Sequence, residues 1–184
     1  MSSFGVVLDV CVLIPATLRD TLLRAVEKGM YRLHWSDEIL DEVRRNFNSG
    51  QERNDQSRRC SRSDRPNESK NAVEANVRGF EASIPAMTND EKDRHVLAAA
   101  VMSRSQVIVT SNIKDFPKQT LEPFGVEAQT PDEFLTHLFY LNPTLMMEIL
   151  SEQAGDLDDP PLTVPEVLAV LAIVAPGFVK LMQS

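Results

Sequence analysis

Two hydrophobic periodicities alternate in the first 50 residues of the chain and predict strands and helices in turn. The apolar run at residues 4–8 ends at Asp9 and predicts a buried strand. Apolar residues then recur at helical spacing over residues 15–29, alternate with polar ones over 31–35, and return to helical spacing over 36–47. The order strand, helix, strand, helix is therefore expected for this half.

Helix-start signals organise the second half of the chain. Thr88 to Glu91 has the sequence of a capping box, with Thr88 at the N-cap of a helix that continues past Val96. Residues 106–110 are rich in valine and isoleucine and predict another buried strand. Thr130 to Glu133 is a second capping box, with proline at the first helical position. The pattern after it is helical.

Strands that alternate with helices predict an α/β fold, with a central parallel sheet flanked by helices and right-handed connections. A length of 184 residues suits one domain of about 130 to 150 residues plus an appendage. In such sheets, functional sites form beyond the carboxyl ends of the strands. Asp9 and residues 112–115 fall at such ends.

Residues 48–71 interrupt the pattern, because they contain no aliphatic or aromatic residue. Such a segment cannot bury enough apolar surface to offset the entropy lost on ordering. We expect a solvated helix or a mobile loop, and we favour a solvated connector over a contact surface for RNA.

Four acidic residues that are far apart in the sequence fall at or beside the predicted element ends. Asp9 closes the first strand, Glu42 lies beside the apolar face of the second helix, Asp93 opens a helical run, and Asp115 follows the strand at 106–110. A hard divalent cation needs oxygen ligands and water in its remaining positions. The four acids are therefore the candidate metal site.

The sequence around these acids resembles the PIN-domain ribonucleases, and within them the VapC-type toxins of type II toxin–antitoxin modules. The likeness covers about residues 4–47 and 80–140. Its most specific parts are the runs at 92–100 and 107–117, which contain Asp93 and Asp115.

The resemblance also implies a domain organisation. It predicts a PIN-like nuclease domain over residues 1–140 and a helical C-terminal extension over 141–184, as in one VapC subgroup. The polar segment 48–71 departs from the family, whose members usually carry a helix with apolar anchors there.

The resemblance to these ribonucleases implies roles for the acids. Asp9 and Asp93 would be direct ligands of Mg2+ or Mn2+, while Glu42 and Asp115 would hold metal-bound waters or a second ion. Repulsion within the cluster would raise the carboxyl pKa values in the absence of metal, so activity is expected to need metal and neutral to alkaline pH. Two polar neighbours would orient the carboxylates: Thr110 and Asn112.

Three of the acids have plainer interpretations. Glu42 could be a solvated helix acid, with Asp41 as its competitor for the site. Asp93 could be an exposed first-turn acid favoured by the helix dipole, and only the family likeness singles it out. Asp115 could be an ordinary turn residue. Asp9 is the firmest candidate, because a buried strand rarely ends in an acid without a partner.

Two further reactive side chains lie near the acids. We interpret His95 as a partly buried structural histidine, because two residues after Asp93 it points away from that carboxylate on a helix. We interpret Cys11 as a small packing residue, because a nucleophilic thiol would need an adjacent activating base.

The net charge of −8 argues against a generic affinity for nucleic acid, because phosphate contacts come from Lys and Arg. The charge is uneven, however. Residues 1–80 hold 13 Lys/Arg and 12 Asp/Glu, whereas residues 81–184 hold 6 and 15. We therefore expect RNA contacts from the N-terminal half, with four candidates: Arg19, Arg24, Arg44 and Arg45.

Cysteine content and hydropathy bear on the compartment. The two cysteines suit a reducing cytosol, no export signal is visible, and no apolar run reaches the length of a bilayer span. We expect a cytoplasmic protein without a membrane partner.

The expected function is that of a metal-dependent endoribonuclease, in which divalent metal activates the water that hydrolyses RNA phosphodiester bonds. The VapC likeness implies that the protein is the toxin of a toxin–antitoxin pair, with RNA as substrate, a cognate antitoxin and a homodimeric state. Two alternatives stay open. One is a phosphatase of the haloacid dehalogenase type, which needs a second acid where this chain has Cys11. The other is a non-catalytic PIN-scaffold binding protein that acts through an antitoxin complex.

Overall fold

A parallel sheet of four strands lies at the centre of the computed structural model, which describes residues 4–51, 76–156 and 162–183. The strand order is β2-β1-β3-β4, and each neighbouring pair is parallel. The predicted α/β class with a central parallel sheet is therefore confirmed. The strands are β1 Gly5–Leu8, β2 Arg32–His34, β3 Val107–Val109 and β4 Glu127–Gln129.

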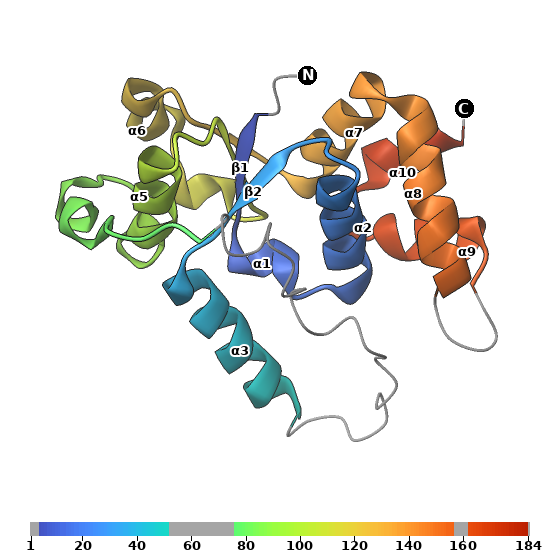
Figure 1. The fold of residues 1–184 in the computed structure, drawn as a ribbon, viewed down its shortest axis with the longest axis horizontal. Coiled ribbons are helices and arrows are strands. Elements are labelled where there is room, and N and C mark those ends of the chain that lie inside the picture. The colour runs from blue at the N-terminus through green and yellow to red at the C-terminus, as the bar shows by residue number, and fades with distance from the viewer. Residues whose placement is uncertain (1–3, 52–75, 157–161, 184) are drawn as a thin grey trace.

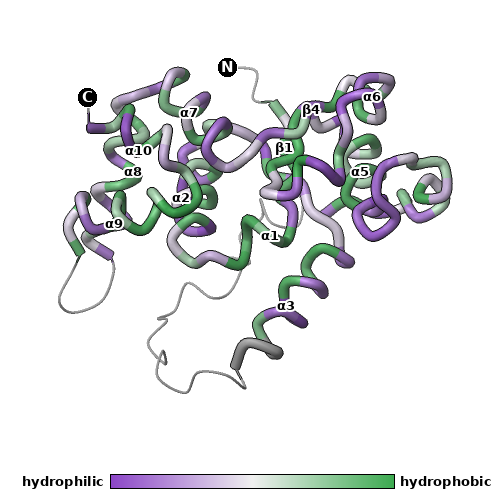
Figure 2. The backbone as a smooth tube through the Cα atoms, turned by 180° about the vertical axis from the view of Figure 1, so that it is seen from behind, coloured by the Kyte–Doolittle hydropathy of each residue, from purple (hydrophilic) through white to green (hydrophobic). Residues whose placement is uncertain are grey.

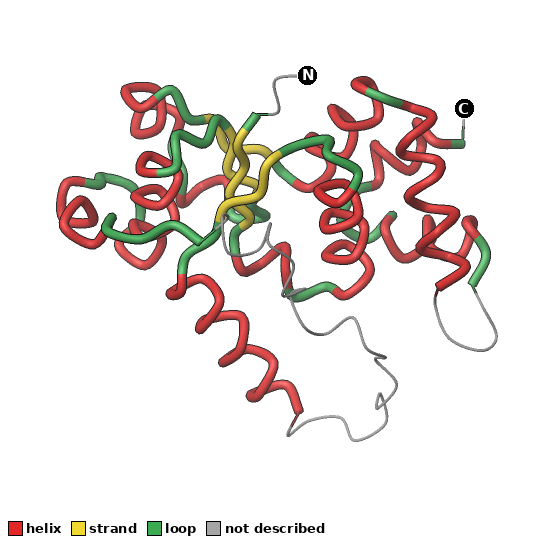
Figure 3. The backbone as a smooth tube through the Cα atoms, in the orientation of Figure 1, coloured by secondary structure: helices red, strands yellow, loops and turns green. Residues whose placement is uncertain are grey.

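Helices and short 3-10 turns surround the sheet (Figures 1 and 3). The N-terminal helices are α1 Val10–Leu13, α2 Ala16–Glu27 and α3 Asp37–Gln51. The middle of the chain forms η1 Glu81–Ala86, η2 Glu91–Asp93, α5 Arg94–Met102, η3 Ile113–Asp115, α6 Lys118–Leu121 and η4 Glu122–Phe124. The C-terminal helices are α7 Pro131–Leu141, α8 Pro143–Asp156, α9 Val164–Leu171 and α10 Pro176–Met182.

The two middle strands form the core of the sheet. β1 and β3 are buried along their whole length, and helix α5 packs against both. α2 and the C-terminal helices lie on the other side of the sheet from α5 (Figure 1). Strands covered on both faces are continuously apolar rather than alternating, and this is the pattern of residues 4–8 in the sequence.

Helix α3 projects from the rest of the molecule (Figure 1), and its coloured part, up to Phe47, alternates polar and apolar residues (Figure 2). Its N-terminus is capped by buried Ser36, whose Oγ accepts a hydrogen bond of 3.3 Å from the amide of Ile39. Farther along, Phe47 is 41% exposed and lies 5.0 Å below the guanidinium of Arg19. The predicted segment 48–71 begins in this helix, and its residues from 52 onward lie outside the described ranges.

The capping box predicted at Thr88 to Glu91 is wrong. Asp90 caps the turn instead, its carboxylate accepting from the amide of Lys92 at 3.1 Å, and α5 begins only at Arg94. The cause is tertiary, because the Asp90 amide donates to the carbonyl of Asp115 (3.2 Å) and so ties this segment to η3. Asp93 consequently lies where the 3-10 turn passes into the helix.

The capping box predicted at Thr130 is confirmed. The Thr130 hydroxyl accepts from the Glu133 amide at 3.2 Å, and the Glu133 carboxylate accepts from the Thr130 amide at 2.8 Å. α7 then packs against α10, whose first amides, Gly177 and Phe178, donate to the Asp132 carboxylate.

The C-terminal region is helical, as predicted, and it is joined to the sheet domain through α2. α8 packs against α2, where the Thr21 hydroxyl donates to the Gln153 side chain at 2.7 Å and both residues are fully buried. The predicted domain boundary at residue 140 stays a prediction. Among the described helices, none is long and apolar enough to cross a membrane.

Candidate active site

Asp9 lies at the carboxyl end of β1, buried between β1 and β3. Its amide donates to the carbonyl of Val109 at 3.0 Å, so the residue is held by the sheet itself. Its carboxylate is 4% exposed and accepts hydrogen bonds from the Val10 amide (2.7 Å), the Thr110 hydroxyl (2.7 Å) and the Cys11 thiol (3.1 Å). These donors offset the cost of burying a charged group and fix the direction of both carboxylate oxygens.

The loop after β3 supports the Asp9 carboxylate through Thr110. The side chain of Asn112 is exposed, and this residue takes part through its backbone amide, which donates to the Thr110 hydroxyl at 2.9 Å. Thr110 therefore contacts Asp9 directly, whereas no hydrogen bond of the Asn112 side chain to another described residue is seen.

Cys11 is more than a packing residue, because its sulfur links the two loops of the site. The thiol donates to Asp9 and accepts from the Ser111 amide at 3.2 Å. Burial, followed by the charge of Asp9, raises the pKa of the thiol to about 11. The thiol therefore stays protonated at neutral pH, which agrees with the expectation that it is not a nucleophile.

Asp93 is half-buried at the start of α5 and faces other acids. Burial and then the charges of Asp9, Asp115 and Asp90 raise the pKa of its carboxyl from 3.8 to about 6. Like charges have this effect only over short distances. Asp9 and Asp115, which follow β1 and β3, are therefore close enough to Asp93 for their charges to act on its carboxyl.

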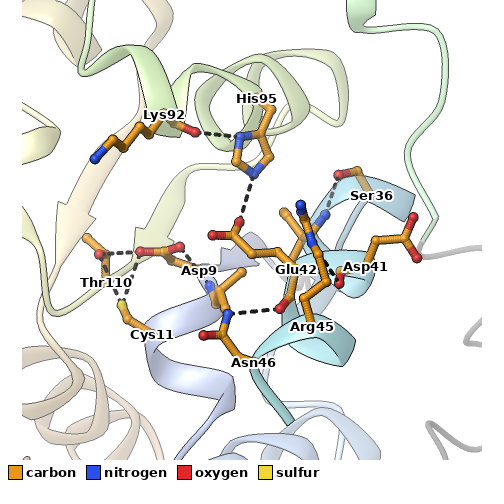
Figure 4. A network of polar contacts seen from close by, with 12 residues as sticks. Asp9, Cys11, Ser36, Asp41, Glu42, Arg45, Asn46, Lys92, His95 and Thr110 are labelled. Atoms are coloured by element: carbon orange, nitrogen blue, oxygen red, sulfur yellow. Dashed lines mark hydrogen bonds and ion pairs between the residues drawn. The ribbon is translucent and has the colours of Figure 1, made fainter. Parts of the chain in front are cut away.

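Glu42 reaches the same region from helix α3. Its carboxylate lies on the side of α3 that faces Asp9 and is 3.7 Å from Nε2 of His95 (Figure 4). Asp41, its competitor from the sequence, is exposed and pairs with Arg44 at 2.7 Å. Helical phase thus directs Glu42 inward and Asp41 outward. The contact of Glu42 with His95 was not predicted from the sequence.

The acids are neighbours without forming a closed ligand cage. In the described part of the chain, no three His, Cys, Asp or Glu side chains are close enough together to hold one ion. Mg2+ keeps several waters and takes one or two carboxylates directly, unlike a structural zinc ion with four protein ligands. Oxygen donors in this loose arrangement fit a hydrated hard cation.

The four arginines proposed for RNA contact have different positions. Arg24 pairs with Asp20 and with Asp156, at 3.0 and 2.9 Å, where α2 meets α8. Arg19 donates to the carbonyl of Leu13 and stacks on Phe47, so it lies between α2 and α3. The remaining two lie on the exposed side of α3, close to Asp41: Arg44 and Arg45.

Two lysines next to candidate acids were not among the predicted RNA contacts, because they belong to the acidic half of the chain. Lys92 and Lys114 are both exposed, and each directly precedes a candidate acid, Asp93 or Asp115. Their position directly before these acids could have identified them in the sequence as candidates for RNA contact.

Comparison with known proteins gives matches to both parts of the chain. A family model described as PIN domain matches residues 5–114, and one described as VapC50 C-terminal domain matches residues 131–184. The curated protein named "Putative ribonuclease VapC50" of Mycobacterium tuberculosis (strain ATCC 25618 / H37Rv) is 40% identical over 100 residues, which cover 54% of this chain and 59% of that protein. The chain therefore matches only about three-fifths of the length of this relative. No solved structure matches the chain.

Proposed function

Because the chain belongs to the PIN-domain family, we propose that it is a metal-dependent endoribonuclease and the toxin of a toxin–antitoxin pair. The observation that supports this most directly is the environment of Asp93, where burial and then the charges of Asp9 and Asp115 raise the pKa of the carboxyl to about 6. Repelling carboxylates at the ends of two parallel strands form a site that a divalent cation stabilises.

In this proposal, Asp9 and Asp93 hold Mg2+ or Mn2+, with Glu42 and Asp115 beside them. When bound, the cation supplies Lewis-acid chemistry, which polarises a phosphate and lowers the pKa of water. Thr110 and Cys11 orient the Asp9 carboxylate through their hydrogen bonds to Oδ2. Asp93 has to lose its proton before it can bind a cation, so binding strengthens as the pH rises through about 6.

The substrate would approach over the exposed rim of the acid cluster. Lys92 and Lys114 flank the cluster, and Arg44 and Arg45 extend from α3. Phosphate groups of RNA are attracted by such side chains, and this attraction offsets the repulsion from the net charge of −8.

The match of the C-terminal region and the name of the relative support a toxin of the VapC type. From this type we propose two protein partners, namely a cognate antitoxin that covers the acid cluster and a second copy of the chain. We place the activity in the cytoplasm, where an RNA substrate is present.

The test compares acids of the cluster with a neighbour that faces away from it. Cleavage of structured RNA by the purified chain is expected to need Mg2+ or Mn2+ and to stop in EDTA. Asp9→Asn and Glu42→Gln should each lower the rate by about a hundredfold or more, because each removes charge from the site. Asp41→Asn is the matched control on α3 and should cleave at nearly the wild-type rate.

Undiminished cleavage by Asp9→Asn, or cleavage in EDTA, would overturn the proposal. Absence of divalent binding at millimolar concentrations would favour the non-catalytic binding protein instead. Trapping of an aspartyl phosphate on Asp9 would favour the phosphatase, although the Cys11 thiol stands where that chemistry needs a second acid.

A further inference from the structure

His95 presents one ring nitrogen to a backbone carbonyl and the other to Glu42. Its Nδ1 lies 2.9 Å from the carbonyl oxygen of Lys92. A carbonyl can only accept a hydrogen bond, so Nδ1 carries a proton and donates it. In the neutral ring, Nε2 is then the nitrogen with the free lone pair.

The environment of Nε2 leaves that lone pair without a hydrogen-bond partner in the described part of the chain. The atom is buried, although the His95 side chain as a whole is 16% exposed. It faces the Glu42 carboxylate, whose Oε2 is 3.7 Å away, too far for a direct hydrogen bond (Figure 4). When the ring is neutral, both facing atoms are electron-pair donors, so neither satisfies the other; a protonated ring would form an ion pair with Glu42 instead.

The separation of the two atoms suits a shared cation. Nitrogen and oxygen ligands about 2.1 Å from one ion lie roughly 3.0 to 3.4 Å apart in octahedral or tetrahedral geometry. Rotation of the Glu42 side chain, which is 41% exposed, is enough to close the small remaining difference. Histidines that bind metals commonly donate their other N–H to a backbone carbonyl, as His95 does to Lys92.

We propose that Nε2 of His95 and the Glu42 carboxylate bind a divalent transition-metal ion, such as Mn2+, at a position between α3 and α5. This inference deepens the proposed function and rests on it, because Glu42 belongs to the same acid cluster. An imidazole ligand favours a transition-metal ion over Mg2+ or Ca2+, which bind oxygen almost exclusively.

The remaining coordination positions stay open. Within the described ranges, no third His, Cys, Asp or Glu completes the set, so water or phosphate oxygens fill them. Open positions distinguish metal sites that react with substrate from purely structural ones. A substrate phosphate would therefore reach the ion between the two helices.

The experiment measures metal binding without RNA. Pulsed electron paramagnetic resonance on wild-type protein loaded with Mn2+ is expected to show coupling to one directly bound 14N nucleus. His95→Gln should lose this coupling and bind Mn2+ about tenfold or more weakly, as followed by calorimetry, with nearly unchanged affinity for Mg2+. His137→Gln is the matched control, since this exposed histidine of α7 contacts Gln129 instead; it should keep both properties.

Each result separates this inference from the proposed function. Absence of 14N coupling in wild-type protein that cleaves RNA overturns the inference alone, and indicates that His95 is an ion-paired or structural histidine. Coupling without RNA cleavage supports the inference and contradicts the nuclease. Absence of Mn2+ binding overturns both. The wild-type spectrum decides the question even if His95→Gln does not fold.

Discussion

Asp9 and Asp93 show how two neighbouring carboxyls are treated differently by their surroundings. Asp9 is buried but accepts hydrogen bonds from three donors. Asp93 is half-buried and faces Asp9 and Asp115, so the pKa of its carboxyl rises to about 6. Hydrogen bonds therefore fix the orientation of the Asp9 side chain, whereas the Asp93 carboxyl becomes an anion only above weakly acidic pH.

Asp93→Asn should stabilise the metal-free protein at pH 7.5. The folded-state pKa of Asp93 lies above its unfolded value of 3.8, so the ionised carboxyl disfavours the fold as the pH rises from about 4 through 6. Since the side chain is partly solvated, we expect a gain of only ~1 kcal/mol in the free energy of unfolding, and none at pH 3.5. Urea denaturation in EDTA at the two pH values measures it.

Addition of Mn2+ provides the control for this prediction. Metal binding should stabilise the wild type more than the variant, because the variant lacks one proposed ligand. A gain of equal size at both pH values would contradict the electrostatic explanation.

The sequence could place a site residue only where the predicted backbone structure already fixes its position. Asp9 follows an apolar strand, so its place at the sheet edge was predictable. The sequence favoured Glu42 over Asp41 because Glu42 lies beside the apolar face of its helix, and the structure places the Glu42 carboxylate near His95 of α5. The thiol of Cys11 and the ring of His95 were given structural roles, because their contacts with Asp9 and Glu42 depend on how separate elements pack.

At the scale of elements, the caps show which helix starts are set by neighbouring residues and which are set by contacts with distant parts of the chain. In the capping box at Thr130, two residues three positions apart satisfy the free backbone amides of their own helix. The sequence pattern was therefore sufficient to predict this helix start. The pattern at Thr88 failed because Asp90 is tied to Asp115 of a different turn. Helix α3 depends on the cap from Ser36 and carries Glu42 out to the site.

Ser36→Ala should both destabilise the protein and weaken metal binding. Loss of an N-cap costs about 1 kcal/mol of unfolding free energy, and here it loosens the helix that holds Glu42. Thr130→Ala removes a cap of similar value from α7 and serves as the control. The two variants should unfold at similar urea concentrations, while only Ser36→Ala loses affinity for Mn2+ in calorimetry. Equal affinities in both would contradict a role for α3 in the site.

At the scale of the whole molecule, the sheet domain and the C-terminal helices share a buried polar contact. Gln153 is fully buried, accepts from the Thr21 hydroxyl and donates to the carbonyl of Thr17 at 2.9 Å. The ion pair of Lys28 with Glu152 lies farther out, on the surface of the same interface. A buried and satisfied contact between α2 and α8 indicates that the two parts unfold together.

Gln153→Ala should lower the free energy of unfolding by about 2 kcal/mol, because it leaves buried partners unsatisfied and a gap between α2 and α8. Lys28→Ala should lower the free energy of unfolding less than Gln153→Ala does, since the ion pair of Lys28 with Glu152 is solvent-exposed. Fluorescence of Trp35, the single tryptophan, reports on the sheet domain, and circular dichroism reports on all helices. Coincident urea transitions are expected, and separate transitions would show that the two parts unfold independently.

The sequence by itself indicated three of the four strands, their parallel arrangement, most of the helical regions and the family, because apolar periodicity and local motifs act over a few neighbouring residues. It did not indicate the strand β4. It also placed Asp9 and the loop ending at Asp115 at one edge of the sheet, since the carboxyl ends of parallel strands meet there. Only the tertiary structure decided that Asp93 titrates near pH 6, that Glu42 faces His95 and that Arg24 pairs across α2 and α8. Those properties depend on distances between side chains far apart in the chain, and such distances are set by packing.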